Sequence, residues 1–163
     1  MSGQVNQTEP FDLEALPGFL IRRMQQVAAA IFAARFEEGR VNLTPVQFAA
    51  LNVVDERPGI DQASLAGMIA CDRVTTGKVV DRLMQAGLIR REVSARDKRA
   101  REVFLLEAGR EALTKARPLV LEIQETILAG LTEAERRAFL KLLIKATDAG
   151  NAVSRAPLVR PEG

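Results

Sequence analysis

The side chains with the clearest chemical potential in this 163-residue chain are basic ones, concentrated between positions 73 and 101. This segment holds nine Lys or Arg and three Asp or Glu, so its net charge is +6, whereas the whole chain carries +2 and the remainder −4. Such side chains neutralise phosphate groups and release the counterions of nucleic acid. A charge-rich stretch is often only a solvated face, so the elements that carry it decide its role. The nine basic residues are Arg73, Lys78, Arg82, Arg90, Arg91, Arg96, Lys98, Arg99 and Arg101.

Enzymatic chemistry is poorly supported by the rest of the composition. The chain has no His and a single Cys, which excludes His-based general acid–base catalysis and any zinc site built from Cys and His. The acidic pairs at 37–38 and 55–56 are adjacent in sequence, so on a helix they diverge instead of converging on one substrate. The sequence has no phosphate-binding glycine loop. We therefore predict a binding protein without catalytic activity, metal or cofactor.

The composition also predicts where the chain works. One Cys cannot form an internal disulfide, which favours a reducing compartment. Residues 1–10 are polar and lack the apolar region of a signal peptide. No apolar run approaches the roughly 20 residues of a membrane-spanning helix. The expected location is the cytoplasm, without a membrane partner.

Hydrophobic periodicity and capping residues predict six helices and one hairpin. A capping box of Thr44 and Gln47 opens the second helix, and a similar box opens the sixth. Asp61 and Asp72 are expected to cap the third and fourth helices, and Gly87 to end the fourth. Apolar residues cover most of the circumference of the second helix, which predicts a central, buried position. The expected helices span about residues 13–38, 45–57, 62–70, 73–86, 108–129 and 133–150, and the expected strands span 88–93 and 101–106.

The third and fourth helices are joined by a tight turn, which makes them a helix-turn-helix candidate. The hairpin that follows has a charged connection at 94–100 and is typical of the wing of a winged helix. This coincidence favours DNA binding over a solvated face, because the N-terminal residues of the second helix of such a motif reach base edges in the major groove. An alternative for Thr75 is that it merely caps the helix together with Asp72. The residues predicted to contact DNA are Arg73, Thr75, Thr76, Lys78 and Arg82 on the helix, and Arg96, Lys98 and Arg99 in the wing.

The helices at the two ends of the chain carry apolar stripes but lie outside the winged core. These stripes need a surface to cover them, and a second copy of the chain supplies one in a twofold dimer. The expected fold is therefore mainly α with a small β-hairpin wing. It is a winged helix-turn-helix flanked by N- and C-terminal dimerisation helices.

Several motifs resemble those of MarR-family transcriptional regulators. Residues 43–51 resemble the opening of a family helix, and residues 80–91 resemble the exit of the recognition helix into the wing. The run Asp97-Lys98-Arg99 is similar to the D-x-R signature of the family's wing. Leu105 and Gly109 match the segment L-T-x-x-G that follows.

One position departs from this pattern, because Leu106 stands where the family has Thr. Thr would cap the fifth helix, so we expect that helix to be capped differently or to start elsewhere. The resemblance covers about residues 13–150. It implies one domain over 11–150, with dimerisation helices at 11–42 and 107–150 and a winged-helix lobe at 43–106; residues 1–10 and 151–163 are expected to be flexible tails.

The resemblance also implies a function. Members of the family are triangular dimers that bind a pseudopalindromic operator of double-stranded DNA and regulate transcription, usually as repressors. In such proteins the arginine of D-x-R, here Arg99, enters the minor groove, and the aspartate, here Asp97, holds the wing through ionic contacts. Arg insertion into a narrow minor groove is physically reasonable.

A short N-terminal stretch is similar to a subset of the family. Residues 16–23 look like those of regulators that sense aromatic carboxylates or their coenzyme A thioesters, in a crevice between the dimerisation helices and the winged lobe. Arg22 or Arg23 would pair with a carboxylate in bidentate geometry, with Phe19 and Phe48 as apolar walls. The alternative is that these arginines lie on the surface or in dimer contacts and the phenylalanines in the core.

Other functions remain open. The chain could be an architectural DNA-binding protein without an effector, which would bind with weak sequence preference. Cys71, at the start of the recognition helix, could be a redox-sensing thiol, or simply a small buried core residue. A winged helix used only for protein interaction agrees poorly with the basic recognition face.

Overall fold

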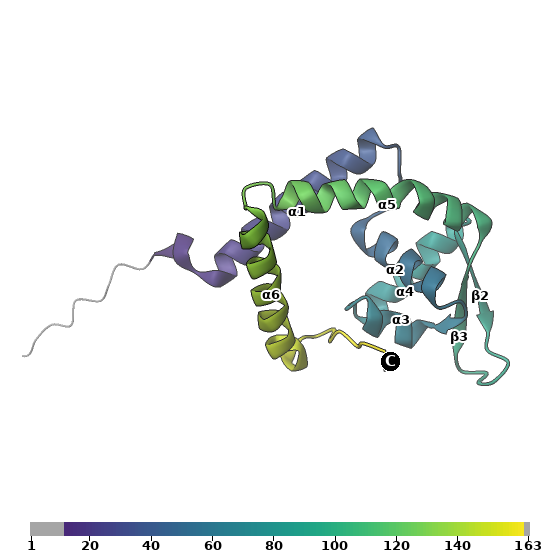
Figure 1. The fold of residues 1–163 in the computed structure, drawn as a ribbon. Helices are drawn as coiled ribbons and strands as arrows, with labels where there is room; N and C mark the ends of the chain where they lie inside the picture. Colours follow the sequence, from purple (N-terminus) through teal and green to yellow (C-terminus); the bar gives the residue numbers. More distant parts are fainter. Residues whose placement is uncertain (1–11, 162–163) are drawn as a thin grey trace, which may run out of the picture.

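The computed structural model describes residues 12–161, in which α1 (Pro17–Glu38) and α5 (Glu107–Ile127) run side by side along one edge of the molecule (Figure 1). The sequence predicts one helix from residue 13, but the structure has a 3-10 turn at Leu13–Ala15 before α1. The interruption falls at Leu16, which is extended because the ring of the following proline disfavours helical geometry there. α6 (Glu133–Gly150) follows α5 and turns away from it steeply.

The other half of the molecule is a lobe of three helices and a small sheet (Figure 1). β2 (Ile89–Val93) and β3 (Arg101–Leu105) form the expected antiparallel hairpin. A further strand, β1 (Ile60–Asp61), pairs antiparallel with β3 and is not predicted by the sequence, because two residues give no periodic signal. These elements confirm the predicted fold class, a mainly α winged helix-turn-helix with a small wing. The helices of the lobe are α2 (Pro45–Glu56), α3 (Gln62–Met68) and α4 (Arg73–Gln85).

Helices in the lobe begin and end where the capping residues predict. The Thr44 hydroxyl accepts the backbone N–H of Gln47 at 3.2 Å, and the Gln47 side chain accepts the backbone N–H of Thr44 at 2.8 Å. Asp61 accepts two backbone N–H groups of the first turn of α3. Gly87 leaves α4 with a φ of +70°, a conformation that glycine adopts readily. α5 starts after Leu106 without a side-chain cap, as the replacement of Thr there predicts.

The hydrophobic core lies in the lobe, around α2. Ala50, Leu51 and Val54 of α2 have no exposed surface, which confirms the predicted central position of this helix. They pack with buried residues of α3, α4, β3 and α5 in one cluster, and each fully buried aliphatic side chain stabilises the fold by about 1.5–3 kcal/mol. In contrast, α6 has no buried residue. No helix among residues 12–161 combines the length and the apolar character that crossing a membrane requires.

Residues 151–161 differ from the flexible tail that the sequence predicts. After α6 the chain makes a 3-10 turn at Asn151–Val153 and then runs back to the lobe (Figure 1). The N–H of Val159 donates to the C=O of Gly67 in α3 at 2.9 Å, so this stretch contacts the lobe instead of extending away from the fold. The other predicted tail, residues 1–10, lies outside the described residues.

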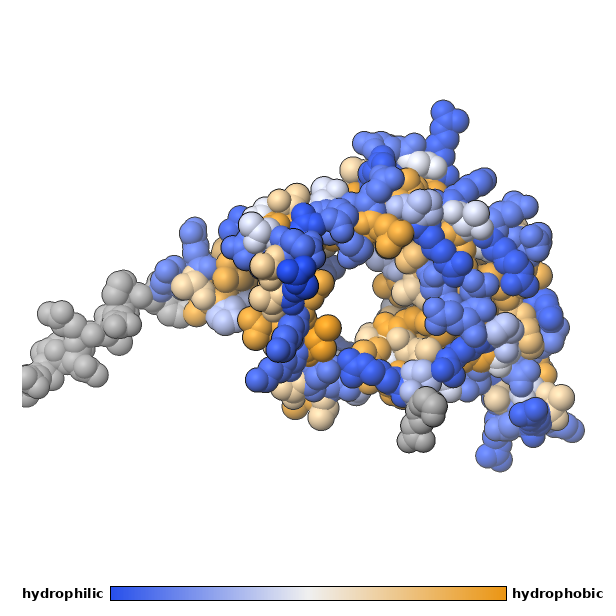
Figure 2. Space-filling view, viewed as in Figure 1, coloured by the Kyte–Doolittle hydropathy of each residue, from blue (hydrophilic) through white to orange (hydrophobic). Residues whose placement is uncertain are grey.

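An opening separates the two halves of the molecule. Figure 2 shows it bordered by α1 and α5, by α6, by the lobe and by residues 151–161, with apolar residues in orange along part of its edge. The dimerisation helices predicted by the sequence therefore stand apart from the winged lobe and meet it mainly along α5.

Candidate nucleic-acid interface

The recognition helix of the helix-turn-helix is α4, and Asp72 organises its first turn. Asp72 Oδ1 accepts the backbone N–H of Thr75 at 2.9 Å, and Oδ2 accepts the Thr75 hydroxyl at 2.7 Å. These hydrogen bonds, the backbone one above all, hold the pKa of the Asp72 carboxyl below its ordinary value. The carboxylate also complements the positive end of the helix. Thr75 is exposed and takes the capping role that the sequence offers as an alternative.

Besides Thr75, α4 presents three basic predicted DNA contacts at the surface. Arg73, Lys78 and Arg82 are exposed, and within residues 12–161 none of them has an ion-pair partner, so their charges are available to phosphates or base edges. Sequence reasoning misses Val74, which exposes 70% of its surface in the first turn. Its apolar side chain fits the methyl group of thymine. Its position off the apolar stripe of the helix is the signal that could have identified it.

Thr76 is the one helix residue whose predicted DNA contact is wrong. It has no exposed surface, so it cannot reach a base, and its hydroxyl has no hydrogen-bond partner in the described part of the chain. Thr76 precedes Val79 and Val80 by three and four positions, which places all three on one helix face, and both valines are buried. Periodicity alone could therefore have assigned Thr76 to the core.

The wing turn between β2 and β3 is held by two side chains. Ser94 is buried, and its hydroxyl accepts the backbone N–H groups of Arg96 and Asp97 at 3.2 and 3.3 Å. Asp97 Oδ1 accepts the backbone N–H of Arg99 at 2.9 Å. The family resemblance implies ionic contacts for Asp97, but among residues 12–161 its carboxylate holds the turn through the backbone and not through an ion pair. Arg96, Lys98 and Arg99 are exposed.

Two further arginines of the basic segment have partners within the lobe: Arg90 within the wing hairpin and Arg91 on α4. The guanidinium of Arg90 lies 4.4 Å from the ring centroid of Phe104 on the opposite strand, and Arg90 also pairs with Glu92. Arg91 forms an ion pair with Asp81 of α4 at 3.1 Å. These two charges therefore have structural partners, which agrees with their absence from the predicted DNA contacts.

The recognition helix and the wing meet in one groove. Arg73 of α4 and Arg99 of the wing both line this groove, which has a volume of about 670 Å³ and also includes Gln62 and Arg101. The groove also contains three carboxylates, Asp61, Asp97 and Glu102. Asp61 caps α3 and Asp97 accepts the backbone N–H of Arg99. The fold thus brings together two elements that are separate in the sequence, the start of the recognition helix and the wing.

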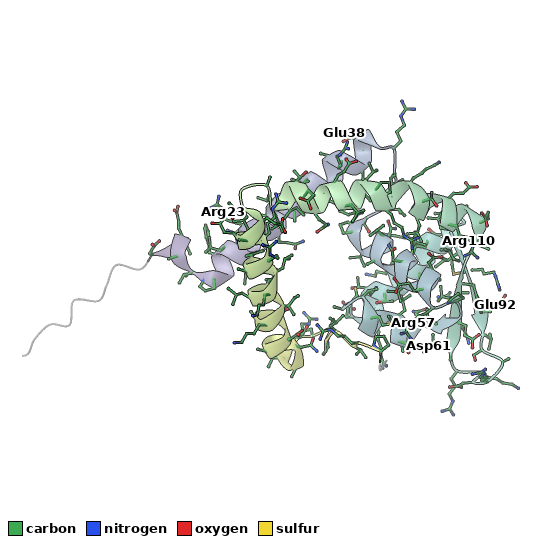
Figure 3. All side chains as sticks on the ribbon, viewed as in Figure 1. Arg23, Glu38, Arg57, Asp61, Glu92 and Arg110 are labelled. Atoms are coloured by element: carbon green, nitrogen blue, oxygen red, sulfur yellow. The ribbon has the colours of Figure 1, made fainter. Side chains whose placement is uncertain are left out.

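The predicted effector residues do not all meet. The guanidinium carbons of Arg22 and Arg23 lie 5.1 and 6.0 Å from the ring centroid of Phe19, at the start of α1. Phe48 is in the lobe, where its ring packs edge-on against Phe36 with centroids 6.5 Å apart. Figure 3 shows Arg23 on the far side of the opening from the side chains labelled in the lobe. Three of the four residues therefore cluster, and Phe48 is separate within one copy of the chain.

Cys71 lies in the turn between α3 and α4. It is half-buried, and its N–H donates to the C=O of Ala66 at 3.0 Å. The structure thus places the thiol next to the recognition helix, as the sequence predicts, and a redox-sensing role stays a prediction.

Comparison with known proteins assigns this architecture. The model of the MarR family matches residues 43–100. The transcriptional regulator HosA of Escherichia coli is 32% identical over 112 residues, which are 69% of this chain and 83% of HosA. BpsR of Bordetella bronchiseptica, whose DNA binding is regulated by 6-hydroxynicotinic acid, superposes with a TM-score of 0.81 at 28% identity over 86% of this chain and 99% of BpsR. The repressor CouR, solved on a 23-mer DNA duplex, has a TM-score of 0.77 at 27% identity, with 86% of this chain and 99% of CouR covered.

The fold and the exposed basic residues of α4 and the wing define a winged helix-turn-helix protein that binds DNA. The chain belongs to the MarR family and is a transcriptional regulator. Because MarR-family regulators are DNA-binding proteins and not enzymes, the family assignment confirms the prediction of a protein without catalytic activity.

Proposed function

We propose that this MarR-family regulator is a homodimeric repressor that binds a pseudopalindromic operator and is released by a small aromatic acid or its coenzyme A thioester. The observation that carries the DNA-binding geometry is the single groove lined by Arg73 and Arg99. In this arrangement α4 enters the major groove with its exposed basic residues, and Arg99 enters the adjacent minor groove. Arg96 and Lys98 contact the flanking phosphates.

Exposed apolar surface on the helices outside the lobe supports the dimer. Ile21 of α1 and Leu142 and Ile144 of α6 expose 63%, 64% and 55% of their surface. A recess of about 410 Å³ between α1, α5 and α6 is lined mainly by apolar side chains, including Met24 and Phe139. A patch of this kind marks a protein interface. A second copy using the same helices covers it and presents two recognition helices to successive turns of DNA.

The relatives support repression and release. CouR is a repressor solved in complex with DNA. The DNA binding of BpsR is regulated by 6-hydroxynicotinic acid, which combines an aromatic ring with a carboxylate. An effector of the same chemical class is therefore the best-supported ligand for this chain.

The cluster at the start of α1 has the chemistry that such a ligand needs. Arg22 and Arg23 offer two guanidinium groups to a carboxylate or to the phosphates of coenzyme A. Phe19 lies beneath both and supplies an aromatic face. Phe48, which packs against Phe36 where α1 meets the lobe, is the proposed apolar wall on the side of the lobe.

The test is a mobility shift on the DNA upstream of the protein's own coding sequence, repeated with a panel of aromatic acids and their thioesters. We expect specific binding that an effector abolishes. Arg22→Ala and Arg23→Ala should keep DNA affinity within about twofold, since they lie outside the lobe, but lose the release. Lys145→Ala, an exposed charge on α6, is the matched control and should keep both properties.

Three outcomes contradict separate parts of this proposal. Absence of specific DNA binding contradicts the proposed binding to an operator. Normal release in both arginine variants contradicts the effector site. Tight binding with no sequence preference and no release indicates an architectural protein instead.

A further inference from the structure

The segment after α6 forms a strap, defined as residues 151–161, with a fixed shape of its own. The side chain of Asn151 donates to the C=O of Leu158 at 3.0 Å and accepts the N–H of Leu158 at 2.7 Å, which closes the segment into a loop. Arg160 forms an ion pair with Asp148 in the last turns of α6 at 2.8 Å. These contacts hold the strap at the end of α6.

The far end of the strap docks on α3. The N–H of Val159 donates to the C=O of Gly67 at 2.9 Å. α3 ends at Met68, and this carbonyl also accepts the N–H of Ala70 at 3.2 Å, so Val159 supplies its second hydrogen bond. The docking requires a residue without a side chain at position 67. A Cβ on Gly67 would lie 2.9 Å from Val159 Cγ2, closer than side chains normally approach.

The strap also acts electrostatically on the start of the recognition helix. The pKa of Asp72 is lowered mainly by the backbone N–H of Thr75, and the positive charge of Arg155 in the strap lowers it further. α3 and α4 pack directly on each other. The strap therefore contacts α3, which packs on α4, the recognition helix of the DNA-binding motif.

The other connections between the two halves lie along α5. The link from α1 to α2 and the junction of β3 with α5 both lie on that side of the molecule (Figure 1). Arg117 of α5 strengthens the same side by pairing with Asp55 of α2 at 2.7 Å. The strap reaches the lobe at the opposite end and closes the ring around the opening (Figure 2).

We infer that docking of the strap on α3 fixes the orientation of the winged lobe relative to α1, α5 and α6, and that its release lets the lobe swing about the α5 side. In the dimer of the proposed function, on which this consequence rests, lobe orientation sets the distance between the two recognition helices. The strap then decides which half-site spacings the protein accepts.

The experiment measures lobe orientation within one protomer, by electron–electron double resonance between two spin labels. The labels are attached to cysteines introduced by Gln85→Cys at the end of α4 and Lys141→Cys on α6, both exposed positions, in a Cys71→Ser background. Labelled chains are diluted with unlabelled chains, so only the distance within a protomer contributes, whatever the oligomeric state. A docked strap gives one narrow distance distribution.

Two variants release the strap by different routes. Val159→Asp removes the apolar contact with α3, and we expect a broader distribution with a shifted mean. Gly67→Ala leaves the strap sequence intact, and its Cβ pushes Val159 away. Because alanine favours a helix more than glycine does, the same broadening in this variant cannot be attributed to a weakened α3. Val153→Asp is the matched control, because Val153 is in the strap but 89% exposed, and it should keep the parent distribution.

The inference would be overturned if Val159→Asp and Gly67→Ala both kept the distance distribution of the parent protein. It would also be overturned if Val153→Asp broadened the distribution as much as they do. Far-UV circular dichroism checks that each variant is folded, which is expected because Val159 is 57% exposed. The consequence for DNA is read separately, from the affinity for selected duplexes whose half-sites are moved apart by one base pair. A monomeric protein would contradict the proposed dimer and leave the distance test intact.

Discussion

The carboxylate of Asp97 accepts the backbone N–H of Arg99, so the residue that shapes the wing turn lies two positions before the residue expected in the minor groove. This hydrogen bond lies within the turn and does not depend on a charged partner at the surface. Salt screens charges that are far apart at the surface, but it affects a hydrogen bond between atoms in direct contact much less. The wing should therefore keep its shape at ionic strengths that weaken its contact with DNA.

The first prediction concerns this pair. Arg99→Ala should lower the affinity for the operator about tenfold and reduce the slope of log K against log salt by about 1, because one phosphate- or groove-binding charge is lost. Asp97→Asn should have a much smaller effect than Asp97→Ala, since the amide oxygen still accepts the N–H of Arg99. Fluorescence anisotropy over a series of salt concentrations measures both quantities. If Asp97→Asn weakens binding as much as Asp97→Ala does, the ionic role that the family resemblance implies is correct.

The second prediction follows from the buried hydroxyl of Thr76. Thr76→Val keeps the shape of the side chain and removes a buried polar group without a partner, so the free energy of unfolding should rise by about 1 kcal/mol or more. Thr76→Ser keeps the hydroxyl and removes the methyl group, so it should destabilise the protein. Urea denaturation measures the change.

DNA affinity is the control for the Thr76 variants. Because Thr76 is buried, Thr76→Val should leave operator binding unchanged. If Thr76→Val is folded and stabilised but binds the operator more weakly, Thr76 contacts DNA after all, contrary to its burial in the structure.

Local interactions explain how much of this architecture the sequence predicts. Thr44 with Gln47 and Thr132 with Glu135 form both expected capping boxes, because each box needs only side chains three positions apart. Elements that depend on distant partners are missed. β1 exists because Ile60 pairs with Val103, and no pattern within two residues reveals that.

The site shows the same division. The exposed basic residues of α4 and the wing follow from charge and motif, but their common groove depends on tertiary packing. The docking of residues 151–161 depends on the absence of a side chain at Gly67, far away in the sequence. Thr76 is different, since its burial follows from helix periodicity, and only its polar character made it look like a surface residue.

The third prediction concerns pH. The folded-state pKa of Asp72 is lowered, chiefly by the backbone N–H of Thr75, so its contribution to stability is present above the unfolded pKa of about 3.9 and is lost as pH falls through the lower folded value. Asp72→Asn has no charge to lose. The variant should therefore be less stable than the wild type at pH 7, and the difference should shrink below about pH 4.

The thermal unfolding midpoints of the wild type and of Asp72→Asn, measured between pH 7 and pH 3, test the direction of this pH dependence. Glu135→Gln is a parallel case, because the pKa of Glu135 is lowered chiefly by the backbone N–H of Thr132 at the start of α6. A difference in midpoint that stays constant over the whole range would show that the charge of Asp72 is not involved.

The fourth prediction tests the proposed dimer. Leu142→Glu places a charge on the exposed apolar face of α6, and this charge would be buried without a partner in the dimer. Size-exclusion chromatography with light scattering should show the mass of a monomer, while circular dichroism shows the lobe still folded. Val153→Glu, at an exposed position beyond α6, should remain dimeric. Unchanged mass for Leu142→Glu would mean that this face of α6 is not the interface.

Asp61 has two roles at once, because it ends β1 opposite Glu102 of β3 and caps α3. No loop separates the sheet from the helix-turn-helix at this point, and the ion pair of Arg91 with Asp81 joins β2 to α4 on another side. We therefore expect the wing to tilt only together with both helices, which keeps the separation between the wing and α4 constant. In the proposed complex, DNA has to adapt its groove width to this constant separation, and we expect part of the sequence preference to reside in base pairs that the protein never touches.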